Sequence, residues 1–215
     1  KNRPLVTGEL SKLSGIVISG ISLIVGASML WFINLNSLLL GLSAFISYAF
    51  IYTPLKGKTS WSVFVGAFPG AIPPMLGAIA HTGSFGFIPG LLFFIQFMWQ
   101  FPHFWAIAWW QNDEYEKAGF KMLPTGKKDK STTFQIIFYS FWAIIMSIVP
   151  YFNVTGDLFL SLYGLVIVII LGMFLLFYSF KLFKNSTTQN AKVLMYVSIL
   201  YLTLVQIVYL IDNLY

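Results

Sequence analysis

Two lysines separated by a single glycine, Lys56 and Lys58, follow a long apolar run. Lysine ammonium groups bind phosphate as point charges, so the pair could hold a phosphorylated ligand. Cations beside an apolar run also set the orientation of a membrane protein, and a lone Lys-Gly-Lys could do only that. The pair alone leaves both interpretations open.

A short acidic segment, Asn112-Asp113-Glu114-Tyr115-Glu116-Lys117, follows another apolar run. Carboxylates at a membrane boundary could hold Mg²⁺, which prefers oxygen ligands and shared phosphate oxygens, so Asp113 and Glu114 are candidate metal ligands. The alternative is a solvated helix end in which Asp113 and Lys117 pair four residues apart. Such a pair stabilises a helix by roughly a few tenths of a kcal/mol.

A histidine stands beside a proline in the uncharged aromatic segment Trp99-Gln100-Phe101-Pro102-His103-Phe104-Trp105. An ionisable group inside a membrane is costly, which favours a functional role for His103. A neutral histidine bonded to a neighbouring helix is the alternative. Helical spacing predicts that Gln96 and Gln100 share a face with His103.

Three prolines and three glycines lie in one apolar run: Gly66, Pro69, Gly70, Pro73, Pro74 and Gly77. Prolines free backbone carbonyls and predict a bent or broken helix. Freed carbonyls inside a bilayer must face protein or a wet cavity. The run could therefore be a kinked helix packed through its glycines, or it could border a substrate cavity.

The composition shows which elements must position these residues. Hydrophobic residues make up 58% of the chain and charged residues only 9%, whereas soluble domains carry about a quarter charged residues. The absence of cysteine excludes disulfides, thiolate metal sites and cysteine nucleophiles. The net charge of +6 lies in short segments between apolar runs, which favours anionic lipid or an anionic substrate over nucleic acid.

Seven continuous apolar runs predict a single all-α domain over residues 1–215, a polytopic transmembrane helical bundle in the lipid bilayer. Continuous runs disfavour a β-barrel, whose strands are short and alternating. The expected spans are Leu13–Phe32, Leu38–Tyr52, Val63–Ala80, Phe87–Gln111, Phe134–Phe152, Leu158–Phe180 and Val193–Ile211.

The lysines and arginines fall in alternate connections between these spans. By the positive-inside rule the basic connections are cytoplasmic and the C-terminus lies outside. We expect a bacterial inner membrane, since no transit peptide is visible and no signal-peptide cleavage site follows the start. The Lys56 loop, the long loop 112–131 and residues 1–12 then share one membrane face, above an apolar interior. Such a site suits an amphiphile with an anionic head and a long apolar tail.

Several motifs resemble those of the protoheme IX farnesyltransferases (heme O synthases), within the UbiA-type intramembrane prenyltransferase superfamily. The resemblance is strongest from Tyr52 to Pro124 and extends over the whole chain. The motifs are Tyr52-Thr53-Pro54-Leu55-Lys56 with Lys58-Thr59, Gly66-Ala67-Phe68-Pro69-Gly70-Ala71-Ile72-Pro73-Pro74, Trp99 to Trp105, Tyr115, Ala118-Gly119, Met122-Leu123-Pro124, and Asn2-Arg3-Pro4-Leu5.

The resemblance implies transfer of the farnesyl group of farnesyl diphosphate to a vinyl group of heme b, with Mg²⁺ assisting diphosphate departure and water completing heme O. A heme A synthase or oxidase-assembly protein is an implied partner. On this basis we predict catalytic roles for Lys56, Lys58, His103, Asp113 and Glu114. His103 could approach the heme iron, orient a propionate or polarise a water. The predicted substrate-binding residues are Arg3, Tyr52, Thr53, Gln100, Trp105, Tyr115 and Lys121.

The sequence departs from the family pattern in two places. The first Asn/Asp-rich motif of the family, which precedes the Arg-Pro-Leu segment, is absent, and a full-length member is expected to have about two further N-terminal spans, about nine in all. An even number of added spans leaves the orientation unchanged. Lys121 stands where the family commonly has proline; this departure could add a cation near the predicted diphosphate site or have no consequence.

Other functions fit parts of the same pattern. A related intramembrane prenyltransferase with a quinone or other aromatic acceptor would share the fold and the donor. A transporter or channel could use the proline-rich span and the polar span as a pathway. A non-catalytic heme-binding assembly subunit is a third alternative. Conversion of heme B to heme O would distinguish the first interpretation from all of these.

Overall fold

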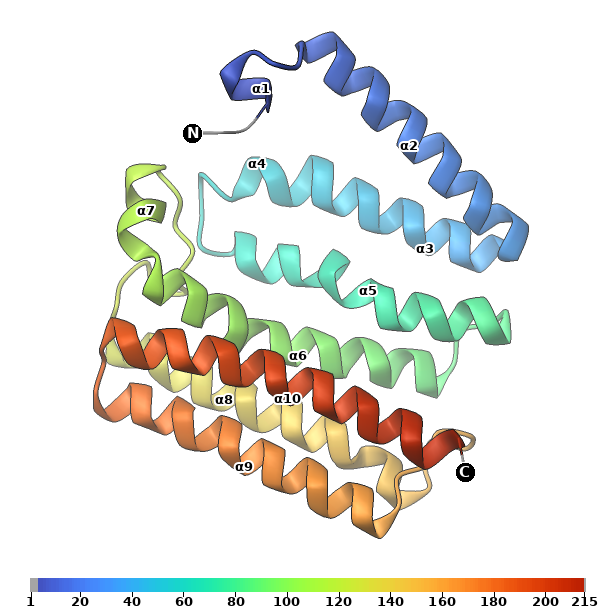
Figure 1. Cartoon of the computed structure of the whole chain (residues 1–215), viewed down its shortest axis with the longest axis vertical. Coiled ribbons are helices and arrows are strands. Elements are labelled where there is room, and N and C mark those ends of the chain that lie inside the picture. The colour runs from blue at the N-terminus through green and yellow to red at the C-terminus, as the bar shows by residue number, and fades with distance from the viewer. Residues whose placement is uncertain (1–3, 215) are drawn as a thin grey trace.

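The computed structural model describes residues 4–214, and every regular element in that range is a helix (Figure 1). Seven stretches of the described chain are long and apolar enough to span a membrane, as the sequence predicts. They are α2 (Lys12–Ile33), α3 (Leu35–Ile46) continued by η1 (Ser47–Tyr52) and α4 (Thr53–Leu55), α5 (Ser62–Thr82), α6 (Phe87–Trp110), α8 (Lys130–Ile148) continued by η2 (Val149–Phe152), α9 (Leu162–Lys184) and α10 (Thr188–Leu214). The short helices are α1 (Pro4–Thr7) and α7 (Asn112–Lys117).

Capping residues explain where these helices differ from the predicted spans. The side chain of Asn34 accepts a bond of 2.8 Å from the Ser37 amide, so α3 begins at Leu35. Ser161 caps α9 in the same way, and that helix begins four residues later than predicted. It also ends four residues later, with Lys181 and Lys184 in its last turn, where cations interact favourably with the helix dipole.

Helix α5 stays a single helix through all of its prolines, so the break considered from the sequence does not occur. It packs between α3 and α6, and its buried residues include Ala67, Pro69, Ala71 and Ile72. Its glycines and Pro69 border a cavity described below.

Helix α6 is the centre of the bundle and packs against α5, α8 and α10 (Figure 1). Its buried face carries Trp99, Phe101, Trp105 and Trp109. Helices α8, α9 and α10 complete a closely packed group, joined by bonds such as Ser140 to Ser179 at 3.0 Å. Interhelical hydroxyl bonds of this kind stabilise helix association in membranes. Helix α2, by contrast, packs mainly on α3 and has no buried residue.

The connections that carry lysines lie at one end of the bundle (Figure 1). The α4–α5 connection, α7 with its following loop, and the α9–α10 connection meet there. The α2–α3, α5–α6 and α8–α9 connections lie at the other end with the C-terminus. This arrangement agrees with the predicted alternation, and we call the lysine-bearing end the basic end.

Candidate active site

A cavity of about 610 Å³ opens at the basic end, between the α4–α5 connection, α7 and the loop that follows α7. Three lysines line it, Lys58, Lys121 and Lys127, and Glu116 is the one carboxylate among its lining residues. We call this the cationic cavity. Its excess of positive charge favours a polyanionic ligand such as a diphosphate.

The loop that carries two of these lysines is anchored at several points. Gly119 and Gly126 both have φ of 73°, a left-handed conformation that favours glycine at the two bends. Between them, the Leu123 side chain is only 2% exposed. The Ser60 hydroxyl donates to the Pro124 carbonyl at 3.0 Å, which ties the loop to the α4–α5 connection. These anchors hold Lys121 and Lys127 over the cavity.

The loop ends at the cap of α8. The carboxylate of Asp129 accepts a bond of 2.8 Å from the Thr132 amide. This bond favours the charged carboxylate and lowers the pKa of Asp129. The first turn of α8 therefore fixes the far end of the lysine-bearing loop.

Helix α7 presents different residues on its two faces. Asn112, Tyr115 and Glu116 line the cationic cavity, and the Asn112 amide donates to Glu116 Oε1 at 2.8 Å. Burial raises the pKa of Tyr115. Tyr115 was predicted from the sequence to bind substrate, and its position beside the cavity is consistent with that role.

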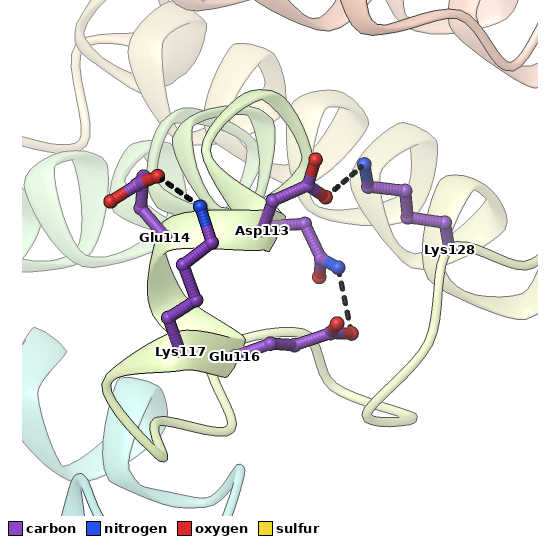
Figure 2. Close-up of polar contacts among 6 residues, drawn as sticks. Asp113, Glu114, Glu116, Lys117 and Lys128 are labelled. Atoms are coloured by element: carbon purple, nitrogen blue, oxygen red, sulfur yellow. Dashed lines mark hydrogen bonds and ion pairs between the residues drawn. The ribbon is translucent and has the colours of Figure 1, made fainter.

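The predicted metal ligands Asp113 and Glu114 are solvent-exposed and point to different sides of α7, Asp113 toward Lys128 and Glu114 toward Lys117 (Figure 2). Glu114 pairs with Lys117 at 2.9 Å, which raises the pKa of Lys117, and Asp113 lies 3.9 Å from Lys128. The alternative considered from the sequence, a solvated helix end with a local ion pair, fits this segment, but Lys117 pairs with Glu114 and not with Asp113. Neither acid lines the cationic cavity, and their role as ligands stays a prediction.

The donor set of the cavity determines what metal it could hold. No group of three or more His, Cys, Asp or Glu side chains gathers anywhere in residues 4–214. Glu116 and the Asn112 side chain supply oxygen donors at the cavity wall. That set fits Mg²⁺ only when diphosphate and water provide most of the ligands, which is the usual mode for this ion.

The two lysines of the α4–α5 connection differ in position. Lys58 lines the cationic cavity. Lys56 Nζ lies 5.2 Å from the centre of the Phe120 ring, and Phe120 is itself a lining residue. Lys56 thus stands one aromatic ring away from the cavity. Arg3 lies outside the described residues, so its predicted role stays a prediction.

A second cavity of about 490 Å³ lies between α3, η1, α5 and α6. We call it the apolar cavity; its lining residues are Ala44, Phe45, Tyr48, Tyr52, Val63, Gly66, Pro69, Gly70, Gln100, Phe104 and Met122. Met122 lines the cationic cavity as well, so the two cavities adjoin at this side chain.

Close contacts at α5 explain the two glycines of this wall. A Cβ atom at Gly66 would lie 2.7 Å from the Tyr52 ring, and one at Gly70 would overlap the Gln100 carboxamide. Gln100 donates to the Ala67 carbonyl at 2.9 Å and is only 2% exposed. The glycines therefore let Tyr52 and Gln100 reach the cavity wall.

The π-helical turn η1 carries Tyr52 into this wall. Such turns occur frequently at functional sites. Thr53, which follows it, is exposed and donates its hydroxyl to the Tyr48 carbonyl at 2.8 Å. Thr53 lines neither cavity, so the structure gives it a local backbone contact, and its predicted substrate contact stays a prediction.

His103 faces α10 instead of the apolar cavity. Its Nδ1 lies 2.8 Å from the Ser198 hydroxyl, and its ring stacks on Trp99 at 4.7 Å between centroids. Trp99 Nε1 donates to the Ser198 carbonyl at 2.6 Å. Gln100 turns toward α5, so the predicted shared face of Gln100 and His103 is wrong. His103 lines neither cavity, and its catalytic role stays a prediction.

Trp105 borders a third cavity of about 470 Å³ on the α8 side of α6. We call it the aromatic cavity; its lining residues are Ser60, Trp61, Phe64, Phe101, Trp105, Pro124, Gln135 and Tyr139. Ser60 and Pro124 line the cationic cavity too.

Sequence reasoning missed several residues that the structure brings to these cavities. Glu116, Lys127 and Met122 are the main ones. The spacing of Asn112, Tyr115 and Glu116 was the available signal, since residues three and four apart share a helix face.

Comparison with known proteins identifies the family. The model of the UbiA prenyltransferase family matches residues 1–204. Proteins named protoheme IX farnesyltransferase from Christiangramia forsetii and Flavobacterium psychrophilum are 51% and 50% identical over 99% of this chain and 71% of their own length. Protoheme IX farnesyltransferase 1 of Bacillus subtilis is 35% identical over 99% of this chain and 67% of its own. No solved structure matches the chain. The chain is therefore an integral membrane prenyltransferase that belongs to the UbiA family.

Proposed function

We propose that this enzyme transfers the farnesyl group of farnesyl diphosphate to a vinyl group of heme b, with addition of water, to form heme O. The observation that carries the proposal is the adjoining of the cationic and apolar cavities at Met122. An anionic head beside a long apolar tail is the shape of a prenyl diphosphate. The names of the relatives supply the farnesyl donor and the heme acceptor.

In this proposal the lysines bind the diphosphate. Charge builds on the leaving diphosphate as its bond to C1 of the farnesyl group breaks. Lys58, Lys121 and Lys127 stabilise that charge from fixed positions, which lowers the barrier. Lys56 adds to the positive potential from behind Phe120. Mg²⁺ bound through the diphosphate, with Glu116 and Asn112 beside it, would neutralise further charge.

The apolar cavity holds the farnesyl chain. Its aromatic side chains, Tyr48, Tyr52 and Phe104 among them, present π faces that stabilise an allylic cation and keep water away from it. The vinyl group of heme b attacks C1, and water then adds to the new cation on the acceptor with loss of a proton. The products are heme O and diphosphate.

The proposed setting is a bacterial inner membrane with the basic end in the cytoplasm. Farnesyl diphosphate, an anionic molecule, would reach the cationic cavity from that side. Heme O stays in the membrane and would pass to a heme A synthase or an oxidase-assembly protein.

The test is formation of heme O by the membrane-reconstituted protein from heme b and farnesyl diphosphate, followed by chromatography of extracted hemes. Lys58→Ala is expected to lower kcat/KM by about 100-fold, because a fixed cation is lost from the leaving group. Lys128→Ala is the control, since Lys128 pairs with Asp113 and does not line the cationic cavity. Prenylation of a quinone but not of heme b would overturn the proposed acceptor.

A further inference from the structure

The two halves of the basic end differ in their balance of charge. Around the cationic cavity, the short helix α7 brings three carboxylates to the lysines. The other half consists of the start of α8, the end of α9 and the start of α10, on the opposite side of α6 from α4 (Figure 1). These three segments carry Lys130, Lys181, Lys184 and Lys192.

These four lysines have little negative charge near them. The sequence contains no Asp or Glu in residues 130–156 or 158–211. Asp212 lies at the other end of the bundle, where it accepts two bonds from Ser161. Asp129 precedes Lys130, and its carboxylate already accepts the Thr132 amide. Positive charge is therefore in excess at the ends of α8, α9 and α10.

Lys130 joins the start of α8 to the end of α9. Its Nζ donates to the Phe183 carbonyl and lies 4.6 Å from the centre of the Phe183 ring. A cation at this carbonyl offsets the negative end of the α9 dipole. The last turn of α9 also carries Lys181 and Lys184, both exposed, and is thereby held beside the first residue of α8.

Exposed phenyl rings continue from these lysines along both helices. On each helix the rings follow one another at spacings of three or four residues, and the same spacing separates the first ring from Lys130 on α8 or from Lys184 on α9. Residues so spaced share a helix face. The rings, all between 47% and 59% exposed, are Phe134, Phe138 and Phe141 on α8 and Phe177 and Phe180 on α9.

The two sets of rings lie on the same side of the helix pair. The hydroxyls of Ser140 and Ser179 bond each other at 3.0 Å and mark the line of contact between α8 and α9. Phe141 and Phe180 each follow their serine by one residue, which turns them about 100° away from that line. Because the helices are antiparallel, equal rotations in chain direction bring both rings to one side. We call this side, with Lys130 and Lys184 at its basic end, the α8–α9 surface.

This surface has the polarity of a phospholipid with an anionic head. Its length is apolar and faces outward, so acyl chains can lie against the rings. Its basic end carries cations at the depth of the membrane interface, where lysines attract anionic headgroups. A zwitterionic headgroup would bring an ammonium group among the same lysines, which disfavours it.

We propose that the α8–α9 surface binds an anionic phospholipid of the phosphatidylglycerol type, with the phosphate at Lys130 and Lys184 and the acyl chains along the exposed phenyl rings. Lys181 adds positive charge from the same turn of α9. The site is separate from the proposed reaction, because neither Lys130 nor Lys184 lines the cationic or the apolar cavity.

The test is titration of the detergent-solubilised protein with phosphatidylglycerol or with phosphatidylcholine of the same chains, with bound lipid counted by native mass spectrometry. Wild type is expected to bind phosphatidylglycerol at least tenfold more tightly. Lys130→Gln with Lys184→Gln should weaken phosphatidylglycerol binding about 30-fold, near 2 kcal/mol, and leave phosphatidylcholine binding unchanged.

A matched control removes two lysines elsewhere at the basic end. Lys12 begins α2, and Lys117 pairs with Glu114 on α7. Lys12→Gln with Lys117→Gln changes the net charge equally but should alter phosphatidylglycerol binding less than twofold. A loss as large as in the Lys130 and Lys184 variant would mean that net charge alone governs binding, and the proposed site would be wrong.

Two further arms keep the test decisive. Lys130→Arg with Lys184→Arg retains the charges and should bind within threefold of wild type, and Lys184→Gln alone, at the exposed end of α9, serves if the double glutamine variant does not fold. Soluble glycerol phosphate should not displace the lipid; displacement at equal concentration would indicate a phosphate site without a lipid. Equal affinity of wild type for the two lipids, or equal phosphatidylglycerol affinity in wild type and the glutamine variants, would overturn the proposal.

Discussion

Helix α6 is packed closely on its α10 side, whereas on its α5 side it borders an open cavity. Toward α10, His103 and Trp99 both bond Ser198, and all three residues are buried. Toward α5, Gln100 reaches the backbone of its neighbour, and glycines leave room beside it. The comparison shows that one helix packs against its neighbours on one face and forms the wall of the apolar cavity on the other.

The difference bears on how polar residues in a span are interpreted. His103 attracts attention because it is ionisable, yet it lies on the packed side. Gln100 is neutral and lies on the cavity side. Three residues of separation place the two side chains against different neighbours, so residue type alone does not identify the side chain that reaches a cavity.

The largest expected effect on activity comes from a substitution in α5 that fills the apolar cavity. Gly70→Leu should lower kcat/KM for heme O formation by about 100-fold, near 2.7 kcal/mol in activation free energy. The new side chain would displace Gln100 and fill the apolar cavity, the proposed site of the farnesyl chain. Gly77→Leu is the matched control, because no atom lies near a Cβ built at Gly77. A fully active Gly70→Leu enzyme would remove the apolar cavity from the proposed mechanism.

Substitutions on the α10 side of α6 are expected to lower the stability of the protein more than its activity. His103→Ala removes the bond to Ser198 and the stack on Trp99, and is expected to destabilise the protein by about 2 kcal/mol. Thermal unfolding in nanodiscs measures this loss, and activity per folded molecule should stay within a fewfold of wild type. A stable but inactive His103→Ala protein would reverse the comparison and support the catalytic role predicted from the sequence.

The two faces of α7 repeat the contrast on a smaller scale. Glu116→Gln should raise the Mg²⁺ concentration for half-maximal activity about tenfold, near 1.4 kcal/mol, because the carboxylate at the cationic cavity is lost. Glu114→Gln should leave it unchanged, since Glu114 is exposed and paired with Lys117. A larger shift for Glu114→Gln or Asp113→Asn would restore the predicted metal ligands.

The smallest expected effect concerns Asp129, which caps the first turn of α8. The Thr132 amide lowers the pKa of Asp129 in the folded protein, so its stabilising contribution is present above the unfolded pKa, near 3.9, and is lost as pH falls through the folded pKa. The wild-type protein should therefore be more stable at pH 7 than at pH 3, and Asp129→Asn should reduce this difference in the free energy of unfolding by less than about 1 kcal/mol. Melting temperatures of both proteins at the two pH values measure the change. An unchanged difference would mean that the cap contributes nothing.

Much of the fold could be predicted because a bilayer leaves few choices. Runs such as Phe87–Trp110 are too long and too apolar for a soluble domain, and alternation of lysines places connections at two ends. Boundaries were harder, because caps such as Asn34 and Ser161 act through single side-chain bonds.

The candidate site was predictable in its location but less so in its members. Lys58, Tyr115 and Lys121 line the cationic cavity, and Tyr52 and Gln100 line the apolar cavity, whereas Thr53, His103, Asp113 and Glu114 line neither; the functional roles of all of them stay predictions. The rotation of α7 and of α6 could not be predicted, since it depends on which neighbours each helix meets. Lys127 and the aromatic cavity depend on a loop fold and on contacts between α5, α6 and α8 that no local pattern encodes.

The segment Met122–Pro124 has a consequence for turnover. In the proposed reaction the diphosphate lies in the cationic cavity on one side of this segment and the farnesyl chain in the apolar cavity on the other. The segment is anchored by the buried Leu123 and by the Ser60 bond. When the bond to C1 breaks, the two halves of the donor would therefore be held apart by a fixed piece of backbone. Recombination of diphosphate with the cation would then be slowed, which favours attack by the acceptor.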